Sequence, residues 1–87
     1  MEDAHRIPIE GTLDLHAFAA RDVRSVVQEY IGAAHHAGLR EVRLIHGRGM
    51  GVQRGIVQSV LEQHQLVASF CDAPDSHLGA TLAILKS

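Results

Sequence analysis

The sequence predicts an α/β fold, a two-layer α/β sandwich in which two helices cover a mixed four-stranded sheet. Its 87 residues are enough for one domain. Apolar residues follow strand-like and helix-like periods in the order β-α-β-α-β-β. Two successive strand-helix-strand units favour parallel pairing with right-handed crossovers, which places both helices on one face of the sheet.

The first half of the chain contains one strand and one helix. The strand is predicted over residues 7–16, because residues 13–16 (LDLH) alternate strictly between apolar and polar side chains. The helix is predicted over residues 19–36, where apolar residues recur at steps of three and one. Gly38 favours its termination, whereas no Ser, Thr or Asn side chain marks its start.

The second half supplies the remaining elements. They are a strand over 42–46, a helix over about 53–64, and strands over 66–71 and 79–85. Glycine-rich residues 47–51 predict a loop between the second strand and the second helix. The short connection at residues 72–78 can reverse the chain, so we expect the last strand to be antiparallel and the sheet to be mixed.

Composition excludes several classes of protein. The chain is 46% hydrophobic, too apolar for a disordered protein, but no segment approaches the roughly 18 apolar residues of a membrane span. Cys71 is the only cysteine, which rules out an internal disulfide and a cysteine-rich zinc site. We therefore expect a soluble cytoplasmic protein that does not bind membranes, with residues 1–7 as a flexible leader and residues 8–86 as the domain.

The charge balance bears on possible partners. The formal net charge is −2, so attraction to nucleic acid requires a local basic patch. Seven of the eight cations are arginines, which suit bidentate contacts with phosphate.

Polar side chains follow the first two predicted strands at their carboxyl ends. Asp14 and His16 fall on the same side of the first strand, about 7 Å apart, and His46 ends the second. A carboxylate and an imidazole at this spacing can serve as general acid and base. The plainer interpretation is that Asp14 caps a turn and His16 only ends a strand.

The glycine-rich loop opens directly into the second predicted helix. Its free amide groups and the positive end of the helix dipole form a candidate anion site, which Arg48 and Arg54 reinforce. The spacing G-x-G-x-G fits neither the dinucleotide fingerprint nor the Walker motif, which argues against nucleotide hydrolysis. Alternatively, the glycines only make a tight turn between strand and helix.

The other chemistry-bearing residues are less informative. The chain has seven histidines, but none pair as His-x-x-x-His and no acidic cluster accompanies them, so we predict no metal and no other cofactor. His35, His36 and His64 are expected at helix ends and His5 in the leader, so only His16, His46 and His77 stay of interest. Phe18 is the only aromatic residue that we expect to be exposed, and a base-stacking platform is not evident.

Together these residues resemble the Smr (small MutS-related) domain. Residues 13–16 match its L-D-L-H signature, residues 46–51 match its H-G-[KR]-G-x-G loop, and residues 79–81 partly keep its G-G-x-G-A-T motif. The resemblance covers about residues 8–86. It implies a fold similar to the C-terminal domain of translation initiation factor three, nucleic-acid binding and, in many members, endonuclease activity. Such domains occur alone or fused to larger MutS-related proteins.

The chain departs from the family pattern at three positions. Ala17 stands where the family usually has glycine, and Ser76 and His77 replace two further family glycines. Side chains at these positions leave less room for a ligand. His77 can equally supply an extra hydrogen-bond donor near a phosphate.

The leading hypothesis is a nucleic-acid endonuclease of the Smr type that cleaves RNA or DNA phosphodiesters, with RNA preferred because its 2′-hydroxyl is an accessible nucleophile. The alternatives are a non-catalytic nucleic-acid-binding module that positions or recruits a partner, within a larger MutS-related or ribosome-associated assembly, and a protein-interaction domain. The expected catalytic residues are Asp14, His16 and His46. The expected phosphate-binding residues are Gly47, Arg48, Gly49, Gly51, Arg54, His77 and Gly79.

Overall fold

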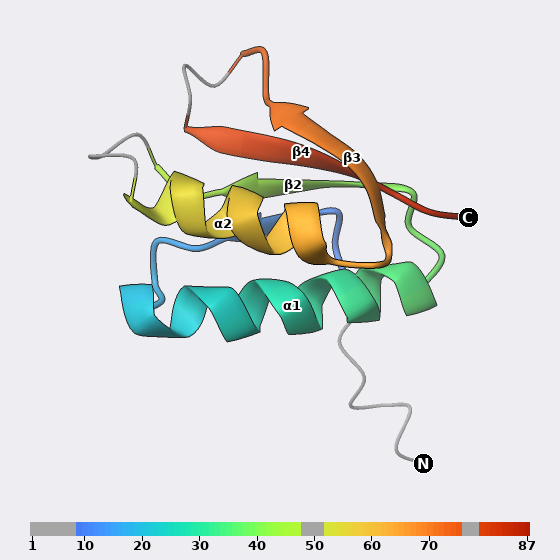
Figure 1. Cartoon of the computed structure of the whole chain (residues 1–87), viewed down its shortest axis with the longest axis horizontal. Helices are drawn as coiled ribbons and strands as arrows, with labels where there is room; N and C mark the ends of the chain where they lie inside the picture. Colours follow the sequence, from blue (N-terminus) through green and yellow to red (C-terminus); the bar gives the residue numbers. More distant parts are fainter. Residues whose placement is uncertain (1–8, 48–51, 76–78) are drawn as a thin grey trace.

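A computed structural model of the chain describes residues 9–47, 52–75 and 79–87. These residues form helices and strands in the predicted order (Figure 1). The elements are β1 (Thr12–Asp14), α1 (Ala20–His36), β2 (Glu41–Ile45), α2 (Val52–Gln63), β3 (Val67–Asp72) and β4 (Ala80–Leu85). Apart from β1, each element lies within one residue of its predicted bounds, so the α/β prediction is confirmed.

The sheet is mixed, and its strand order is β1-β2-β4-β3. β1 is parallel to β2, whereas β4 is antiparallel to both of its neighbours, as predicted for the last strand. The sequence did not indicate that β4 lies between β2 and β3. In this position Ala80 pairs with Ile45 and Thr81 with Leu44. The start of β4 therefore lies beside the end of β2, where the glycine-rich loop begins.

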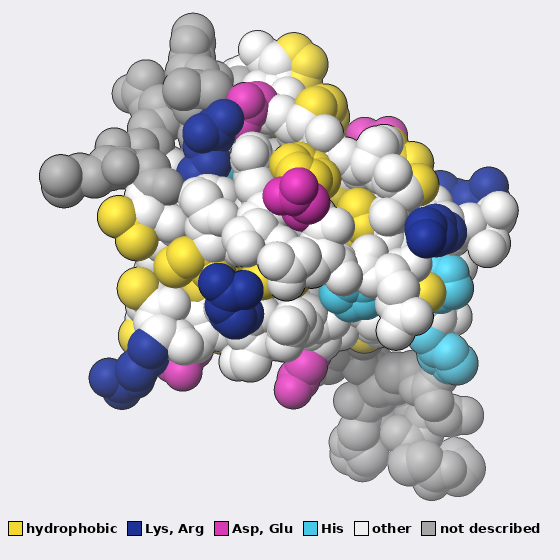
Figure 2. Space-filling model, in the orientation of Figure 1, with side chains coloured by type: hydrophobic (Ala, Val, Ile, Leu, Met, Phe, Trp, Pro, Cys, Tyr) yellow, Lys and Arg dark blue, Asp and Glu magenta, His cyan; other side chains and the backbone are white. Residues whose placement is uncertain are grey.

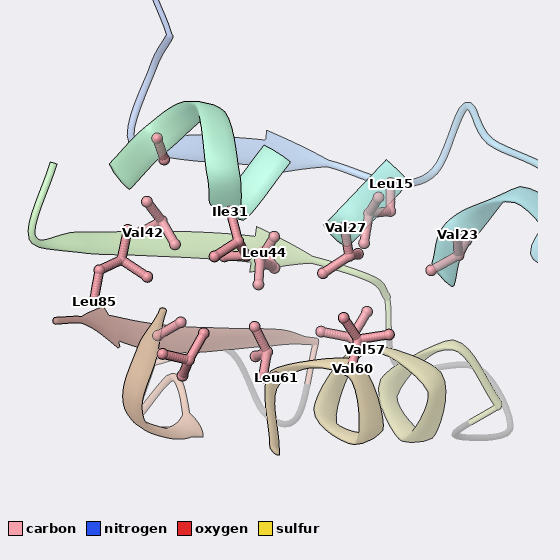
Figure 3. Packing of buried hydrophobic residues seen from close by; sticks show 13 residues of the cluster. Leu15, Val23, Val27, Ile31, Val42, Leu44, Val57, Val60, Leu61 and Leu85 are labelled. Atoms are coloured by element: carbon pink, nitrogen blue, oxygen red, sulfur yellow. The ribbon is translucent and has the colours of Figure 1, made fainter. Parts of the chain in front are cut away.

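Both helices lie on one face of the sheet and pack against each other (Figure 1). Alternate residues of β2 and β4 point toward them, which places Val42, Leu44 and Leu85 in the core. The buried side chains of α1 and α2 meet these strand residues in one cluster (Figure 3). Its helical members are Val23, Val27, Ile31, Ala34, Val57, Val60 and Leu61.

The C-terminal end of α1 confirms the predicted stop at Gly38. This glycine has a φ of +90°, in the left-handed region that side chains disfavour. Its N–H donates to the His35 carbonyl at 3.0 Å, and the Leu39 N–H donates to the Ala34 carbonyl at 3.0 Å. This pair of bonds satisfies carbonyls that the end of a helix otherwise leaves free.

β1 is shorter than the strand predicted over residues 7–16, of which residues 7 and 8 lie outside the described residues. The Leu15 N–H still donates to the Ile45 carbonyl at 2.8 Å, and the Leu15 side chain is fully buried. The chain turns at His16, because the Asp14 carboxylate accepts the His16 backbone N–H at 2.9 Å. The predicted strand position of His16 is therefore wrong.

Candidate active site

Asp14 and His16 form a hydrogen-bonded pair where the chain leaves β1. Asp14 Oδ1 lies 2.7 Å from His16 Nδ1 and also accepts the His16 backbone N–H. The two side chains are 61% and 62% exposed, so a substrate can reach them. The turn brings the pair closer together than a strand would. Asp14 thus caps a turn, as the plainer interpretation predicted, and it pairs with the imidazole at the same time.

The electrostatics of the pair keep Asp14 ionised. The backbone N–H of His16, followed by the ring N–H, holds the pKa of the Asp14 carboxyl below its ordinary value. Near neutral pH the carboxylate is therefore charged and can only accept hydrogen bonds.

The pairing determines which nitrogen of His16 can react. Because Asp14 accepts, Nδ1 carries a proton, and Nε2 of the neutral ring keeps its lone pair. Within the described part of the chain, no group is hydrogen-bonded to this Nε2. A carboxylate that fixes the tautomer of an adjacent imidazole in this way is the arrangement used for general-base catalysis.

Gly47 lies beside Nε2 of the His16 ring. Its φ is +81°, and a Cβ atom added there would lie 3.0 Å from His16 Nε2. The backbone conformation therefore favours glycine, and a side chain there would also press on the exposed ring of His16. The loop after β2 thus begins beside the ring of His16, which brings the first two sequence motifs together.

His46 differs from His16 because it is buried, with only 4% of the residue exposed. Its Nδ1 lies 3.0 Å from the Gly47 carbonyl oxygen, and its Nε2 lies 2.9 Å from Thr81 Oγ1. Both ring nitrogens are therefore engaged with the protein. The convergence of His46 with the other site residues was predicted, whereas its burial was not.

A polar network continues from Thr81 toward α2. Thr81 Oγ1 accepts a hydrogen bond from Gln58 Nε2 at 3.1 Å, and Gln58 Nε2 also donates to Asp72 Oδ1 at 3.0 Å. Arg54 donates to both carboxylate oxygens of Asp72 at 2.8 Å. These hydrogen bonds hold the pKa of Asp72 below its ordinary value, and those from Arg54 have the largest effect. Two of the three Arg54 nitrogens that we expected to bind phosphate, Nε and Nη2, are thus directed at Asp72.

Gln58, Asp72 and Thr81 were missed as site residues in the sequence. Two signals point to them once the fold is known. Gln58 follows Arg54 by four residues, so both lie on the same face of α2. Thr81 is the only polar residue of β4 and is fully buried, so it requires a hydrogen-bonding partner.

The backbone of Gly79 connects the loop to the start of β4. Its carbonyl oxygen accepts the N–H groups of His46 at 3.1 Å and Gly47 at 2.9 Å. The Gly47 amide is therefore used within the protein. The remaining predicted phosphate-binding residues, Arg48, Gly49, Gly51 and His77, lie outside the described residues.

Basic and acidic side chains are interspersed on the face of the molecule that Figure 2 shows. This distribution agrees with the formal net charge of −2. On this face the described residues form no continuous basic surface, so attraction to a polyanion would come from a local group of cations.

An open hollow lies apart from the Asp14–His16 pair, and two other kinds of feature are absent from the described residues. An open hollow of about 270 Å³ at the C-terminal end of α2 is lined by Gln28, Gln63, His64 and Gln65, at the other end of this helix from Gly47. Within residues 9–47, 52–75 and 79–87, no three His, Cys, Asp or Glu side chains group closely enough to hold a metal ion. No helix in these ranges is both long and apolar enough to cross a membrane.

Comparison with known proteins agrees with this fold and these motifs. The family model of the Smr domain matches residues 13–86. Endonuclease MutS2 of Geobacillus kaustophilus is 37% identical over 87 residues, which are 98% of this chain and 11% of that protein. Endonuclease MutS2 of Caldicellulosiruptor saccharolyticus is 32% identical over 80 residues, or 90% of this chain and 10% of that protein. The chain thus spans about a tenth of the length of these relatives.

Two solved structures are also similar. The Smr domain of Thermus thermophilus MutS2 superposes with a TM-score of 0.83 and 29% identity, covering 90% of this chain and all of that one. YdaL, a stand-alone small MutS-related protein from Escherichia coli, gives a TM-score of 0.75 and 28% identity, covering 98% of this chain and 71% of that one. With its two signature motifs meeting at His16 and Gly47, the chain belongs to the Smr domain family.

Proposed function

We propose that this domain is an endonuclease that cleaves the RNA backbone, with His16 as its general base and Asp14 as the carboxylate that holds the His16 ring. The main observation is that Asp14 holds Nδ1 of His16, whereas Nε2, which lies beside Gly47, has no hydrogen-bonding partner among the described residues. Two relatives carry the name endonuclease MutS2, which supports cleavage of a nucleic-acid backbone as the reaction.

In the proposed reaction, His16 Nε2 accepts the proton of a 2′-hydroxyl as that oxygen attacks the adjacent phosphorus. The bond between phosphorus and the 5′-oxygen breaks, and the 5′-oxygen takes up a proton from water. The products are a 2′,3′-cyclic phosphate and a 5′-hydroxyl. RNA is the preferred substrate because it contains the hydroxyl group that a general base of this kind can activate. Asp14 stabilises the imidazolium that forms.

The loop after Gly47 is the proposed phosphate-binding element. Arg48 and the amides of Gly49 and Gly51 supply donors that offset the charge on the phosphate, and His77 adds a further donor. Gly47 contributes by lacking a side chain, because its amide already donates to Gly79. For Arg54 we propose a supporting role, since Asp72 holds its Nε and Nη2.

The test uses purified protein with end-labelled single- and double-stranded RNA and DNA, with and without a chelator. We expect chelator-resistant cleavage of RNA that leaves 2′,3′-cyclic phosphate ends. Products with a 5′-phosphate contradict the mechanism. Activity that is lost in chelator and returns with a divalent ion also contradicts it.

The second candidate is a non-catalytic module that binds nucleic acid and positions a partner within a larger MutS-related or ribosome-associated assembly. The three departures from the family pattern, Ala17, Ser76 and His77, favour it. So does the formal net charge of −2, which is modest for a domain that binds nucleic acid. Salt-dependent gel shifts without cleavage of any substrate would support this candidate over the first.

For either role we propose a cytoplasmic location. Cys71 is a free and exposed thiol, which suits a reducing compartment.

A further inference from the structure

The two histidines of the site differ in their hydrogen bonding, and this difference points to separate roles. We propose that His46 is a positioning residue. Thr81 and Gln58 hold its ring in the tautomer with the proton on Nδ1, and the ring in turn holds Gly47 against His16. The effect on cleavage rests on the proposed function, whereas the tautomer can be measured without any substrate.

The tautomer follows from the partners of the two ring nitrogens. Nδ1 lies 3.0 Å from the carbonyl oxygen of Gly47, which can only accept a hydrogen bond. Nδ1 therefore carries the proton, and Nε2 of the neutral ring is an acceptor. Nε2 lies 2.9 Å from Thr81 Oγ1, so the Thr81 hydroxyl donates to it.

The next residues in the network support this direction. Because the single hydroxyl proton of Thr81 goes to His46, its oxygen accepts the first Gln58 amide proton. The second amide proton goes to Asp72, whose oxygens also accept from Arg54. Within the described residues, every buried side-chain nitrogen and oxygen has a hydrogen-bonding partner. The alternative tautomer would place an N–H of His46 against the hydroxyl and leave the Gly47 carbonyl without this donor.

The network ends at the residue that faces His16. The carbonyl of Gly47 accepts from His46 Nδ1, and its N–H donates to the Gly79 carbonyl, so both sides of Gly47 are held. Its α-carbon faces the His16 ring, since a Cβ added to it would lie 3.0 Å from His16 Nε2. A change in the His46 ring would therefore shift Gly47 and alter the space in which Nε2 meets a substrate.

Burial separates His46 from direct contact with a substrate. Only 4% of the residue is exposed, whereas the His16 side chain is 62% exposed. A general base needs a lone pair that the reacting proton can reach, and the Nε2 lone pair of His46 already accepts the Thr81 hydroxyl. This places the proton transfer on His16 and the support on His46.

The first test is NMR of the intact chain with ¹⁵N-labelled histidine, in which couplings between ring protons and nitrogens identify the tautomer. In the parent we expect His46 to carry its proton on Nδ1 and to accept a hydrogen bond at Nε2. Thr81→Val should remove the resonance shift caused by that bond, and Thr81→Ser should keep it. A parent His46 protonated on Nε2, or a Thr81→Val variant with an unchanged Nε2 resonance, would overturn the proposal.

Gln58→Leu gives a second test at a half-buried position on α2, with Gln63→Leu, exposed on the same helix, as its matched control. We expect Gln58→Leu to lower kcat for cleavage by about 10- to 100-fold, because Gly47 is no longer held in place beside His16. Gln63→Leu should cleave near the parent rate, and Thr81→Ser should restore what Thr81→Val loses. A Gln58→Leu variant that cleaves at the parent rate overturns the positioning role. If the parent cleaves nothing, the proposed function fails, and the NMR measurement still decides the role of His46.

Discussion

The chain turns from strand to helix twice, and each turn begins with a histidine. After β1, the side chain of His16 is exposed, with one ring nitrogen on Asp14 and the other without a hydrogen-bonding partner in the described part of the chain. After β2, His46 is buried, and Gly47 and Thr81 occupy both of its nitrogens. Two residues of the same type at equivalent positions are therefore suited to opposite tasks. The Nε2 lone pair of His16 suits it to proton transfer. His46 uses both of its ring nitrogens in hydrogen bonds, which suits it to holding Gly47.

The largest effect is expected at the exposed pair. His16→Ala and Asp14→Asn should each lower the cleavage rate by about 10²–10⁴-fold, because the first removes the base and the second removes the carboxylate that fixes its tautomer. His16→Ala should change the free energy of unfolding by no more than about 0.5 kcal/mol, since the side chain is exposed. Single-turnover cleavage and urea denaturation measure the two quantities. His36→Ala, an exposed histidine of α1, is the control. Parent-like cleavage by both site variants would remove this pair from the mechanism.

The next effect compares two glycines with positive φ. Gly47→Ala and Gly38→Ala both place a side chain in the left-handed region, which costs about 1–2 kcal/mol of stability. An added Cβ meets His16 Nε2 at Gly47 but meets nothing within 4 Å at Gly38. We therefore expect both variants to melt earlier and only Gly47→Ala to lose cleavage beyond its loss of folded protein. Equal cleavage by the two folded variants would show that the contact with His16 does not matter.

A smaller effect is expected in the loop that follows Gly47. If Arg48 contacts phosphate, Arg48→Ala should weaken RNA binding similarly across sequences and reduce the slope of log K against log salt by about one unit. Fluorescence anisotropy at several salt concentrations measures the slope. Arg24→Ala, an exposed arginine of α1, controls for the loss of one charge. A slope that changes equally in both variants would argue against a specific contact at Arg48.

The smallest effect concerns pH. The pKa of Asp14 is lowered in the folded chain, first by the His16 backbone N–H and then by the ring. Its stabilising contribution is therefore complete above the ordinary value of 3.8 and is lost as pH falls through the lowered folded value. We expect the Asp14 carboxyl resonance to titrate below 3.8 in the parent and closer to it in His16→Ala, which keeps only the backbone donor. A parent midpoint at or above 3.8 would contradict the pairing.

Most of the fold was predictable because it depends on local periodicity. The apolar stripe of α1 and the terminating Gly38 each act within a few residues, and both were confirmed. The insertion of β4 between β2 and β3 was not predictable in this way, because it depends on pairing between distant segments. The alternating pattern also failed at His16, where the backbone N–H donates a hydrogen bond to the Asp14 carboxylate and the chain turns out of the strand.

The sequence predicted which residues come together at the candidate site, but not which of them are buried or bonded to each other. Asp14, His16, His46 and Gly47 do converge, because the carboxyl ends of β1 and β2 are neighbours. The burial of His46 depends on Thr81 of β4, and the pairing of Arg54 depends on Asp72 of β3. These partners come from strands whose positions the sequence did not indicate. Arg54 and His46, which the pattern predicted as phosphate-binding and catalytic residues, therefore make hydrogen bonds to other side chains of the protein.

The assignment of proton transfer to His16 is best tested by comparing two titrations of the same protein. One is the pH dependence of kcat/KM for RNA cleavage, which reports the ionisation of the free enzyme. The other is the NMR titration of the His16 and His46 rings in the absence of substrate. We expect the rising limb of kcat/KM to have the midpoint of His16 and to disappear in His16→Ala. A limb that follows His46 instead, or one that persists unchanged in His16→Ala, would contradict the division of roles between the two histidines.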